Sequence, residues 1–140
     1  MKDAKTIVQY GGDDFFIATS PSGHAVTVDV RGGRSAAPSP LEMLLVSLGA
    51  CTGADVVSIL AKKRLKVTSY RVELRGDRRE EHPGSFRRIE LRHILHGRGL
   101  TEQAVSQAIA LSTDKYCSVA ATIRPTAEIV TSYEILEEAG

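Results

Sequence analysis

Two cysteines are the residues of this chain with the clearest capacity for chemistry. Cys51 lies between Gly49 and Gly53, and Cys117 lies shortly after Lys115. A thiolate is a nucleophile, and two thiols that meet can form and reopen a disulfide. The pair therefore suggests peroxide-reducing redox chemistry, although a free cysteine in a helix can also serve simply as a small core residue.

The surroundings of Cys51 contain glycine and a carboxylate. Gly49 and Gly53 each cost a helix interior about 1 kcal/mol relative to alanine. Either another backbone packs closely here, or the thiol needs open space for a substrate. Asp55 shares a helix face with Cys51, so it either marks a polar opening beside the thiol or pairs with a basic side chain such as Arg64.

Cys117 follows a helix-capping signal that begins at Ser112. We expect its sulfur to lie in the first turns of a short helix with Lys115 close by, and both features lower the pKa of a thiol. The spacing of the two cysteines in the sequence neither supports nor forbids contact between their sulfurs.

The remaining candidates have simpler structural roles. Glu42 lies three residues after Ser39, which is the pattern of a capping box, and a catalytic use of Glu42 stays open. The histidines show no spacing typical of a metal site. His93 is in phase with Ile89 and Leu91, which favours a core histidine over a metal ligand.

A long apolar helix dominates the predicted structure. Ser39 as N-cap and Pro40 as first helical residue mark its beginning, and it runs to about Lys62. Its apolar side chains fall on every face, so we expect it to be buried all round. At about 34 Å it spans a domain of this size, which predicts a homodimer whose shared core includes this helix.

The other elements are predicted by period-two alternation and capping signals. Strands are expected at about residues 6–10, 15–19, 25–31, 67–75, 86–96 and 127–135, and two further helices between about 101 and 125. Alternating Val26, Val28 and Val30 should bury one face of their strand. The order β-β-β-α-β-β-α-α-β predicts an α+β fold in one domain, residues 1–140.

Composition narrows the function. The 140 residues carry 18 Lys and Arg against 17 Asp and Glu, a net charge of +1, so nucleic acid and anionic membranes are not expected partners. We expect no bound cofactor. The first residues show no signal pattern and two cysteines make no secreted disulfide scaffold, so a reducing cytoplasm is expected, without membrane spanning.

The residues around both cysteines resemble the OsmC/Ohr family, most closely its YhfA-like branch. The matching segments are residues 37–45, 48–60 and 111–119, with further similarity at 78–81 and 132–134. The resemblance implies an intertwined homodimer with buried central helices that reduces organic hydroperoxides. It implies that Cys51 attacks the peroxide, that Cys117 resolves the sulfenic acid as a disulfide, and that a dithiol reductant reopens it.

The same resemblance implies a glutamate and an arginine near the first thiol. The position that matches the family glutamate is Leu41, with Glu42 one residue later, and the position that matches the arginine is Asp13. Glu42 and Arg34 are therefore the candidates for these roles. The departure motivates one alternative, a small-molecule binding protein without peroxidase activity, and another alternative is an interaction protein whose cysteines only pack.

Overall fold

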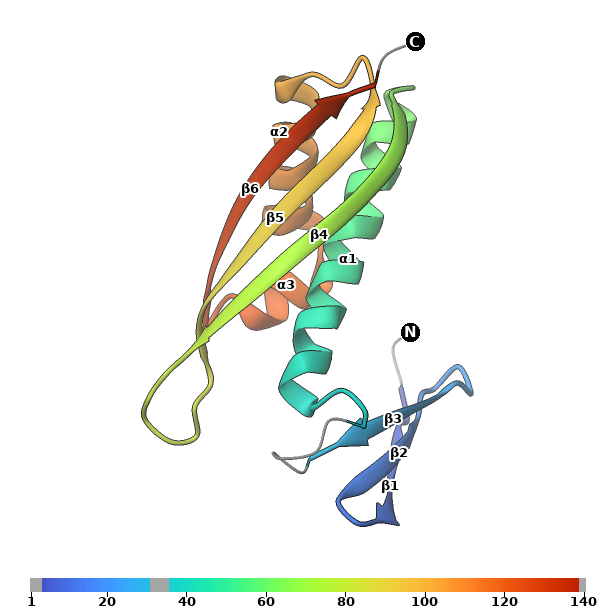
Figure 1. The fold of residues 1–140 in the computed structure, drawn as a ribbon, viewed down its shortest axis with the longest axis vertical. Helices are drawn as coiled ribbons and strands as arrows, with labels where there is room; N and C mark the ends of the chain where they lie inside the picture. The colour runs from blue at the N-terminus through green and yellow to red at the C-terminus, as the bar shows by residue number, and fades with distance from the viewer. Residues whose placement is uncertain (1–3, 31–35, 139–140) are drawn as a thin grey trace. The chain divides into compact units, whose positions relative to one another are not determined.

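The structure is a computed structural model that describes residues 4–30 and 36–138. The chain forms two compact units, residues 1–44 and 45–140. Its elements follow the predicted order of three strands, a long helix, two strands, helical segments and a final strand (Figure 1). The α+β prediction is confirmed. The single-domain assignment stays a prediction.

The N-terminal unit contains a three-stranded antiparallel sheet in the order β1-β2-β3. Its strands are β1 (Ile7–Gly12), β2 (Phe15–Thr19) and β3 (Ala25–Asp29). β1 includes Gly11 and Gly12, and the chain reverses at Asp13 and Asp14, whose φ angles of 54° and 63° are left-handed. Asp is among the residues that tolerate this conformation best.

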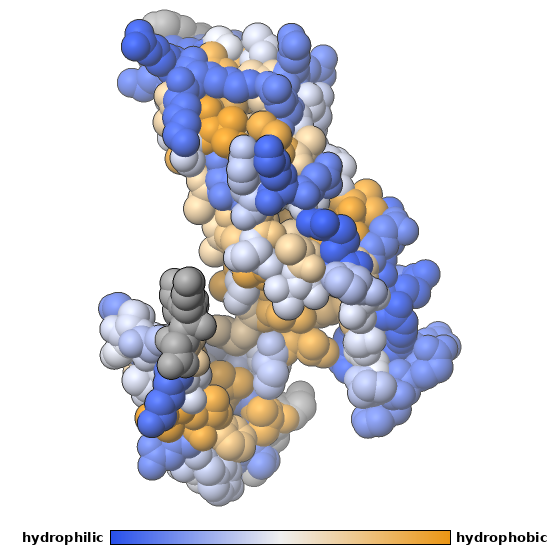
Figure 2. All heavy atoms as spheres, turned by 180° about the vertical axis from the view of Figure 1, so that it is seen from behind, coloured by the Kyte–Doolittle hydropathy of each residue, from blue (hydrophilic) through white to orange (hydrophobic). Residues whose placement is uncertain are grey.

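One face of this sheet is apolar but not buried. Val26 and Val30 are 41% and 46% exposed, so the prediction that their face is buried is wrong within the single chain. With other apolar residues they line an open hollow of about 420 Å³; the lining consists of Val8, Phe16, Ala18, Val26, Val28, Val30, Pro40 and Met43. Figure 2 shows apolar side chains gathered on this unit. The alternation identified the face, but covering it needs atoms from outside the unit.

Helix α1 (Pro40–Lys62) begins and ends where the sequence predicts. Its buried residues, however, are Leu48, Thr52, Val56 and Leu60, a single stripe with a spacing of four. Most of its other apolar side chains remain accessible, Val46 being 59% exposed. The expectation of burial on every face includes a second subunit, so it stays a prediction.

By length and composition α1 could also cross a membrane. We interpret it as a core helix, because its buried stripe packs against other elements of the C-terminal unit. The polar side chains of Thr52 and Asp55, near the middle of the helix, also form hydrogen bonds with the hydroxyl of Ser112.

The C-terminal unit is a three-stranded sheet with helices on one face (Figure 1). Strands β4 (Lys66–Arg78) and β5 (Phe86–Arg98), both expected from the sequence, form an antiparallel hairpin, and β6 (Glu128–Glu137) lies parallel to β5. Between β5 and β6 lie α2 (Glu102–Leu111), the π-helical turn η1 (Ser112–Tyr116) and α3 (Ser118–Ile123). Thr101 caps α2, because its Oγ1 accepts from the N–H of Ala104 at 3.1 Å.

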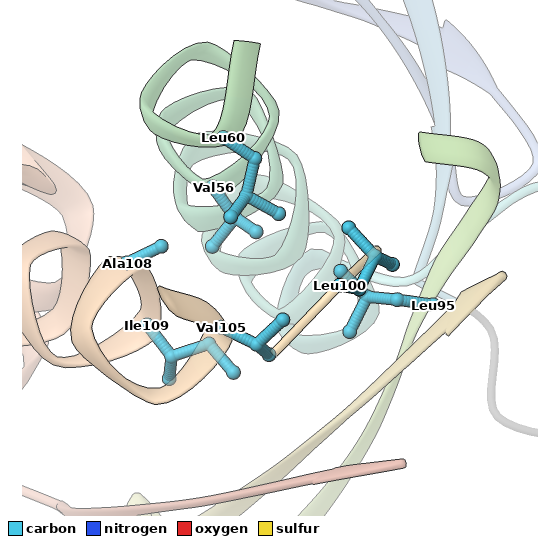
Figure 3. Close-up of a cluster of buried hydrophobic side chains, with 7 residues drawn as sticks. All are labelled: Val56, Leu60, Leu95, Leu100, Val105, Ala108 and Ile109. Atoms are coloured by element: carbon cyan, nitrogen blue, oxygen red, sulfur yellow. The ribbon is translucent and has the colours of Figure 1, made fainter. Parts of the chain in front are cut away.

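The core of this unit joins α1, β5 and α2. Side chains from all three meet in one buried cluster, which Figure 3 shows; its members are Val56, Leu60, Leu95, Leu100, Val105, Ala108 and Ile109. The sheet instead carries exposed ion pairs, such as Arg71 with Glu73 on β4 and Arg92 of β5 with Glu134 of β6.

Candidate functional site

The structure brings the two cysteines together. The thiol of Cys117 donates a hydrogen bond to the sulfur of Cys51, and neither cysteine is in a disulfide. Cys51 lies on α1 and is half-buried, whereas Cys117 is buried. A half-buried and a buried thiol in contact form a pair that can close into a disulfide, with the first sulfur open to a reactant.

The π-helical turn determines the position of Cys117. The N–H of Cys117 donates to the carbonyl of Ser112 at 2.8 Å, which closes the wide turn. Cys117 is then extended and caps α3, where its sulfur accepts from the N–H of Ala120 at 3.3 Å. It therefore lies at the cap and not inside the helix as predicted, because the extra residue of the π turn shifts the start of α3.

Hydrogen bonds acidify Cys51. Burial is the largest influence and raises the pKa of its thiol. The Cys117 thiol, the backbone N–H of Val119 and the Ser118 hydroxyl all donate to the sulfur and lower that pKa, while the Asp55 carboxylate raises it. The net result is a pKa below the ordinary value, since three donors stabilise the thiolate.

Cys117 has the opposite character. Burial, the hydrogen bond to Cys51 and the charge of that neighbour together raise the pKa of its thiol to about 11. The prediction that Cys117 is the acidified thiol is therefore wrong. Its proton is donated to the sulfur of Cys51. The Lys115 ammonium, which was expected to lie close to Cys117, lies 5.5 Å from the centre of the Tyr116 ring.

Asp55 belongs to a hydrogen-bonded group that sequence reasoning missed. Its Oδ2 accepts from the hydroxyl of Ser112 at 2.8 Å, and that hydroxyl lies 2.8 Å from Oγ1 of Thr52. The sequence pattern indicates only a helix-capping role for Ser112. Two polar residues, Thr52 and Asp55, on an otherwise apolar helix indicate that a polar partner lies nearby. Only the tertiary structure shows that this partner is Ser112.

Close packing explains one of the two glycines beside Cys51, Gly49, whereas a Cβ at Gly53 would make only ordinary contacts. A Cβ at Gly49 would lie 2.8 Å from Cδ1 of Leu74, and one at Gly53 would lie 3.5 Å from Cε2 of Tyr70. The prediction that another backbone packs closely here is wrong, because it is side chains of β4 that approach the helix.

His93 is a core residue, as predicted. It is fully buried, and the Tyr70 hydroxyl lies 2.8 Å from its Nδ1 with the two rings stacked. Burial lowers the pKa of His93 to about 4 and raises that of Tyr70. The histidine is thus neutral and shares a hydrogen bond with the tyrosine hydroxyl through its Nδ1. Among the residues that the structure describes, no cluster of three or more potential ligands could hold a metal.

Glu42 forms the predicted capping box. The N–H of Ser39 donates to its Oε1 at 2.9 Å, and its own N–H donates to Oγ of Ser39 at 3.2 Å. A catalytic role for Glu42 stays a prediction. Arg34 lies outside the described residues, so its role also stays a prediction.

Comparison with known proteins supplies the family. Residues 32–132 match the model of the OsmC-like protein family. Protein YhfA of Escherichia coli K12 is 45% identical over 121 residues, which cover 86% of this chain and 90% of YhfA. The crystal structure of a hypothetical protein from Aquifex aeolicus VF5 is 34% identical, with a TM-score of 0.88 over 99% of this chain and 100% of that one.

A more distant solved structure has the same fold. It is described as an organic hydroperoxide resistance protein OsmC from Legionella pneumophila, and it is 14% identical with a TM-score of 0.69, covering 96% of this chain and 98% of that one. With a family match over most of its length, and a paired-thiol site built on that fold, the chain belongs to the OsmC-like protein family.

Proposed function

We propose that this protein is a thiol-dependent peroxidase that reduces organic hydroperoxides in the defence against oxidative stress. The observation that carries the proposal is the contact between an acidified, half-buried Cys51 and a buried, protonated Cys117. The description of the Legionella relative as a hydroperoxide resistance protein agrees with this chemistry.

In the first step Cys51 acts as the nucleophile. Its thiolate attacks the terminal oxygen of the hydroperoxide, the one that carries hydrogen, so that an S–O bond forms while the O–O bond breaks. Cys51 becomes a sulfenic acid, and the leaving alkoxide takes a proton to become an alcohol. The sulfur is oxidised by two electrons and the peroxide is reduced by two.

In the second step Cys117 acts as the resolving thiol. Once Cys51 is a neutral sulfenic acid, the thiolate charge that helps to hold the Cys117 pKa high is gone. Cys117 can then lose its proton and attack the sulfenic sulfur. The S–S bond forms and hydroxide leaves as water. The ionisation of the two thiols is thereby ordered, Cys51 first and Cys117 second.

A dithiol reductant completes the cycle. It reopens the Cys51–Cys117 disulfide by thiol–disulfide exchange and leaves as its own disulfide. The net reaction converts one hydroperoxide and one dithiol into one alcohol, one water and one disulfide. Every electron comes from the dithiol, so the proposed cycle needs no bound cofactor.

The homodimer belongs to the same proposal. Val46 and Val57 on α1 are 59% and 46% exposed, and the sheet of the N-terminal unit carries its own open apolar hollow. Apolar surface of this extent is typical of an interface between subunits. A second copy of the chain is the partner we propose for it, in the reducing cytoplasm that the free thiols suggest.

The test compares the wild-type protein with Cys51→Ser. Consumption of cumene hydroperoxide in the presence of a dithiol should be catalytic for the wild type and absent for the variant. Equal rates would eliminate the proposal. An apolar ligand seen by native mass spectrometry, without peroxide turnover, would instead favour the small-molecule binding protein.

A further inference from the structure

Ser112 connects both cysteines. It is fully buried. Its backbone carbonyl accepts the N–H of Cys117 at 2.8 Å, and its hydroxyl lies 2.8 Å from Oγ1 of Thr52, the residue that follows Cys51 on α1. One residue therefore holds the backbone of the second cysteine and contacts the neighbour of the first.

The direction of these hydrogen bonds follows from their chemistry. The Asp55 carboxylate only accepts, so the Ser112 hydroxyl donates to its Oδ2 at 2.8 Å. Ser112 is then left with lone pairs, and the Thr52 hydroxyl donates to it. In this network, which runs from Thr52 through Ser112 to Asp55, both hydroxyl protons are donated in hydrogen bonds. A buried polar network whose hydrogen bonds are satisfied in this way makes its surroundings rigid.

The charge of Asp55 needs an explanation that the peroxidase site does not provide. Asp55 raises the pKa of Cys51, so its carboxylate works against formation of the nucleophile. A role as the acceptor that fixes Ser112 accounts for a carboxylate at this position, because a hydrogen bond to a charged group is stronger than one between neutral groups.

We propose that Ser112, anchored by Asp55 and Thr52, is a positioning residue that holds Cys117 against Cys51. This inference rests on the proposed function. Holding two reacting groups in place raises their effective concentration. Ser112 should therefore control the formation of the disulfide, while the attack of Cys51 on peroxide, which involves only Cys51 and its donors, should depend on it little.

The first experiment separates the two steps in Ser112→Ala, with Ser106→Ala on the exposed side of α2 as the matched control. Each protein is reduced and mixed with cumene hydroperoxide, and sulfenic acid and disulfide are quantified over time by trapping and mass spectrometry. Ser112→Ala should form sulfenic acid within about twofold of the wild-type rate and the disulfide about tenfold more slowly, since a buried hydrogen bond to a carboxylate is lost. Equal disulfide rates in Ser112→Ala and Ser106→Ala would overturn the inference.

The second experiment does not depend on peroxide. Protein is equilibrated with reduced and oxidised glutathione, which gains two electrons as the two thiols close, and the disulfide fraction is measured. Ser112→Ala should lower the equilibrium constant for the disulfide about tenfold. A wild type that forms the disulfide here but never reduces peroxide would contradict the proposed function alone, and an unchanged constant in Ser112→Ala would contradict the positioning role alone.

Asp55 supplies a second route if Ser112→Ala folds poorly. Asp55→Asn keeps an oxygen acceptor for Ser112, whereas Asp55→Ala removes it. Disulfide formation should be slowed about tenfold in Asp55→Ala and clearly less in Asp55→Asn, which keeps a weaker, neutral acceptor. Both variants lose the charge that opposes the Cys51 thiolate. Equal disulfide rates in the two variants would refute the anchor, because a purely electrostatic or structural role would affect both alike.

Discussion

At the scale of residues, the division of labour between the two thiols comes from a few hydrogen bonds. Cys51 is acidified by donors at the start of α3, and Cys117 is one of those donors. The same bond raises the pKa of Cys117, since its proton stabilises the neighbouring sulfur. A cationic side chain is thus not required to explain an acidic Cys51, since hydrogen bonds to the thiolate form supply part of the same stabilisation.

This argument predicts how Cys51 responds to changes at Cys117. Cys117→Ala removes a hydrogen-bond donor and should slow alkylation of Cys51 by iodoacetamide at pH 7 about tenfold, because a hydrogen bond to a charged group is lost. Cys117→Ser keeps a hydroxyl donor and a helix cap and should retain most of the wild-type rate. Rates of alkylation measured between pH 5 and 9 check this. Identical profiles for Ala and Ser would show that the donor has no influence.

His93 predicts a loss of stability in acid. Burial lowers its pKa to about 4 in the folded state, below the value of about 6.5 of an unfolded chain. The unfolded state therefore binds the proton first, so the free energy of unfolding is fully retained above about pH 6.5. It then falls by about 3 kcal/mol as the pH drops to about 4.

The matched variant for this prediction is His93→Gln. Its side chain can accept from Tyr70 but does not titrate in this range. Urea unfolding at pH 7 and pH 4.5 should show a clearly smaller loss for His93→Gln than for the wild type. Parallel losses in the two proteins would mean that the carboxylates alone account for the acid sensitivity.

At the scale of elements, α1 presents different faces to different neighbours. Its stripe of Leu48, Thr52, Val56 and Leu60 is buried, and Gly49 and Gly53 allow the side chains of β4 to approach. Cys51 points its thiol toward the start of α3. Gly49 thus lets Leu74 of β4 pack tightly against the part of the helix that carries the nucleophile.

Substitution of the two glycines should have different effects. A Cβ at Gly53 would make ordinary contacts, so Gly53→Ala should raise the free energy of unfolding by about 1 kcal/mol through better helix propensity. A Cβ at Gly49 would overlap Leu74, so Gly49→Ala should gain nothing or lose about 1 kcal/mol. Urea unfolding with equal m-values decides the matter. A stabilised Gly49→Ala would show that Leu74 moves away freely.

At the scale of the whole molecule, each unit leaves apolar surface accessible. In the C-terminal unit this surface includes Val46 and Val57 on α1, and in the N-terminal unit it includes Val8 and Val26 on the sheet. Burial of such surface is the main favourable contribution to association. The proposed homodimer would cover it and would restore the burial on all sides that the composition of α1 predicts.

The dimer is tested at α1. Val57→Asp places a charge on the exposed apolar face and should shift the sedimentation coefficient from that of a dimer to that of a monomer at micromolar concentration, because an unpaired charge would be buried in the interface. Ser106→Asp on α2 is the control and should leave the wild-type value unchanged. A monomeric wild type would contradict the dimer, and a dimeric Val57→Asp would place the interface elsewhere.

The sequence by itself determined the elements and the candidate nucleophiles. Capping residues such as Ser39 and Thr101 and the alternation in the strands are local signals, since they depend on hydrogen bonds and side-chain periods within a few residues. The order of elements and the ends of α1 were therefore predicted correctly. The chemistry of Cys51 and Cys117 was likewise apparent from residue type alone.

Only the tertiary structure decided which thiol is acidic and what holds the pair together. The prediction assigned the low pKa to Cys117 because of Lys115, but the pKa of a thiol depends on burial and on donors that arrive from distant parts of the chain. Ser112 likewise contacts Thr52 and Asp55, which lie 60 and 57 residues earlier in the chain. Interactions of this kind fall off within a few ångströms in space, so sequence separation carries almost no information about them.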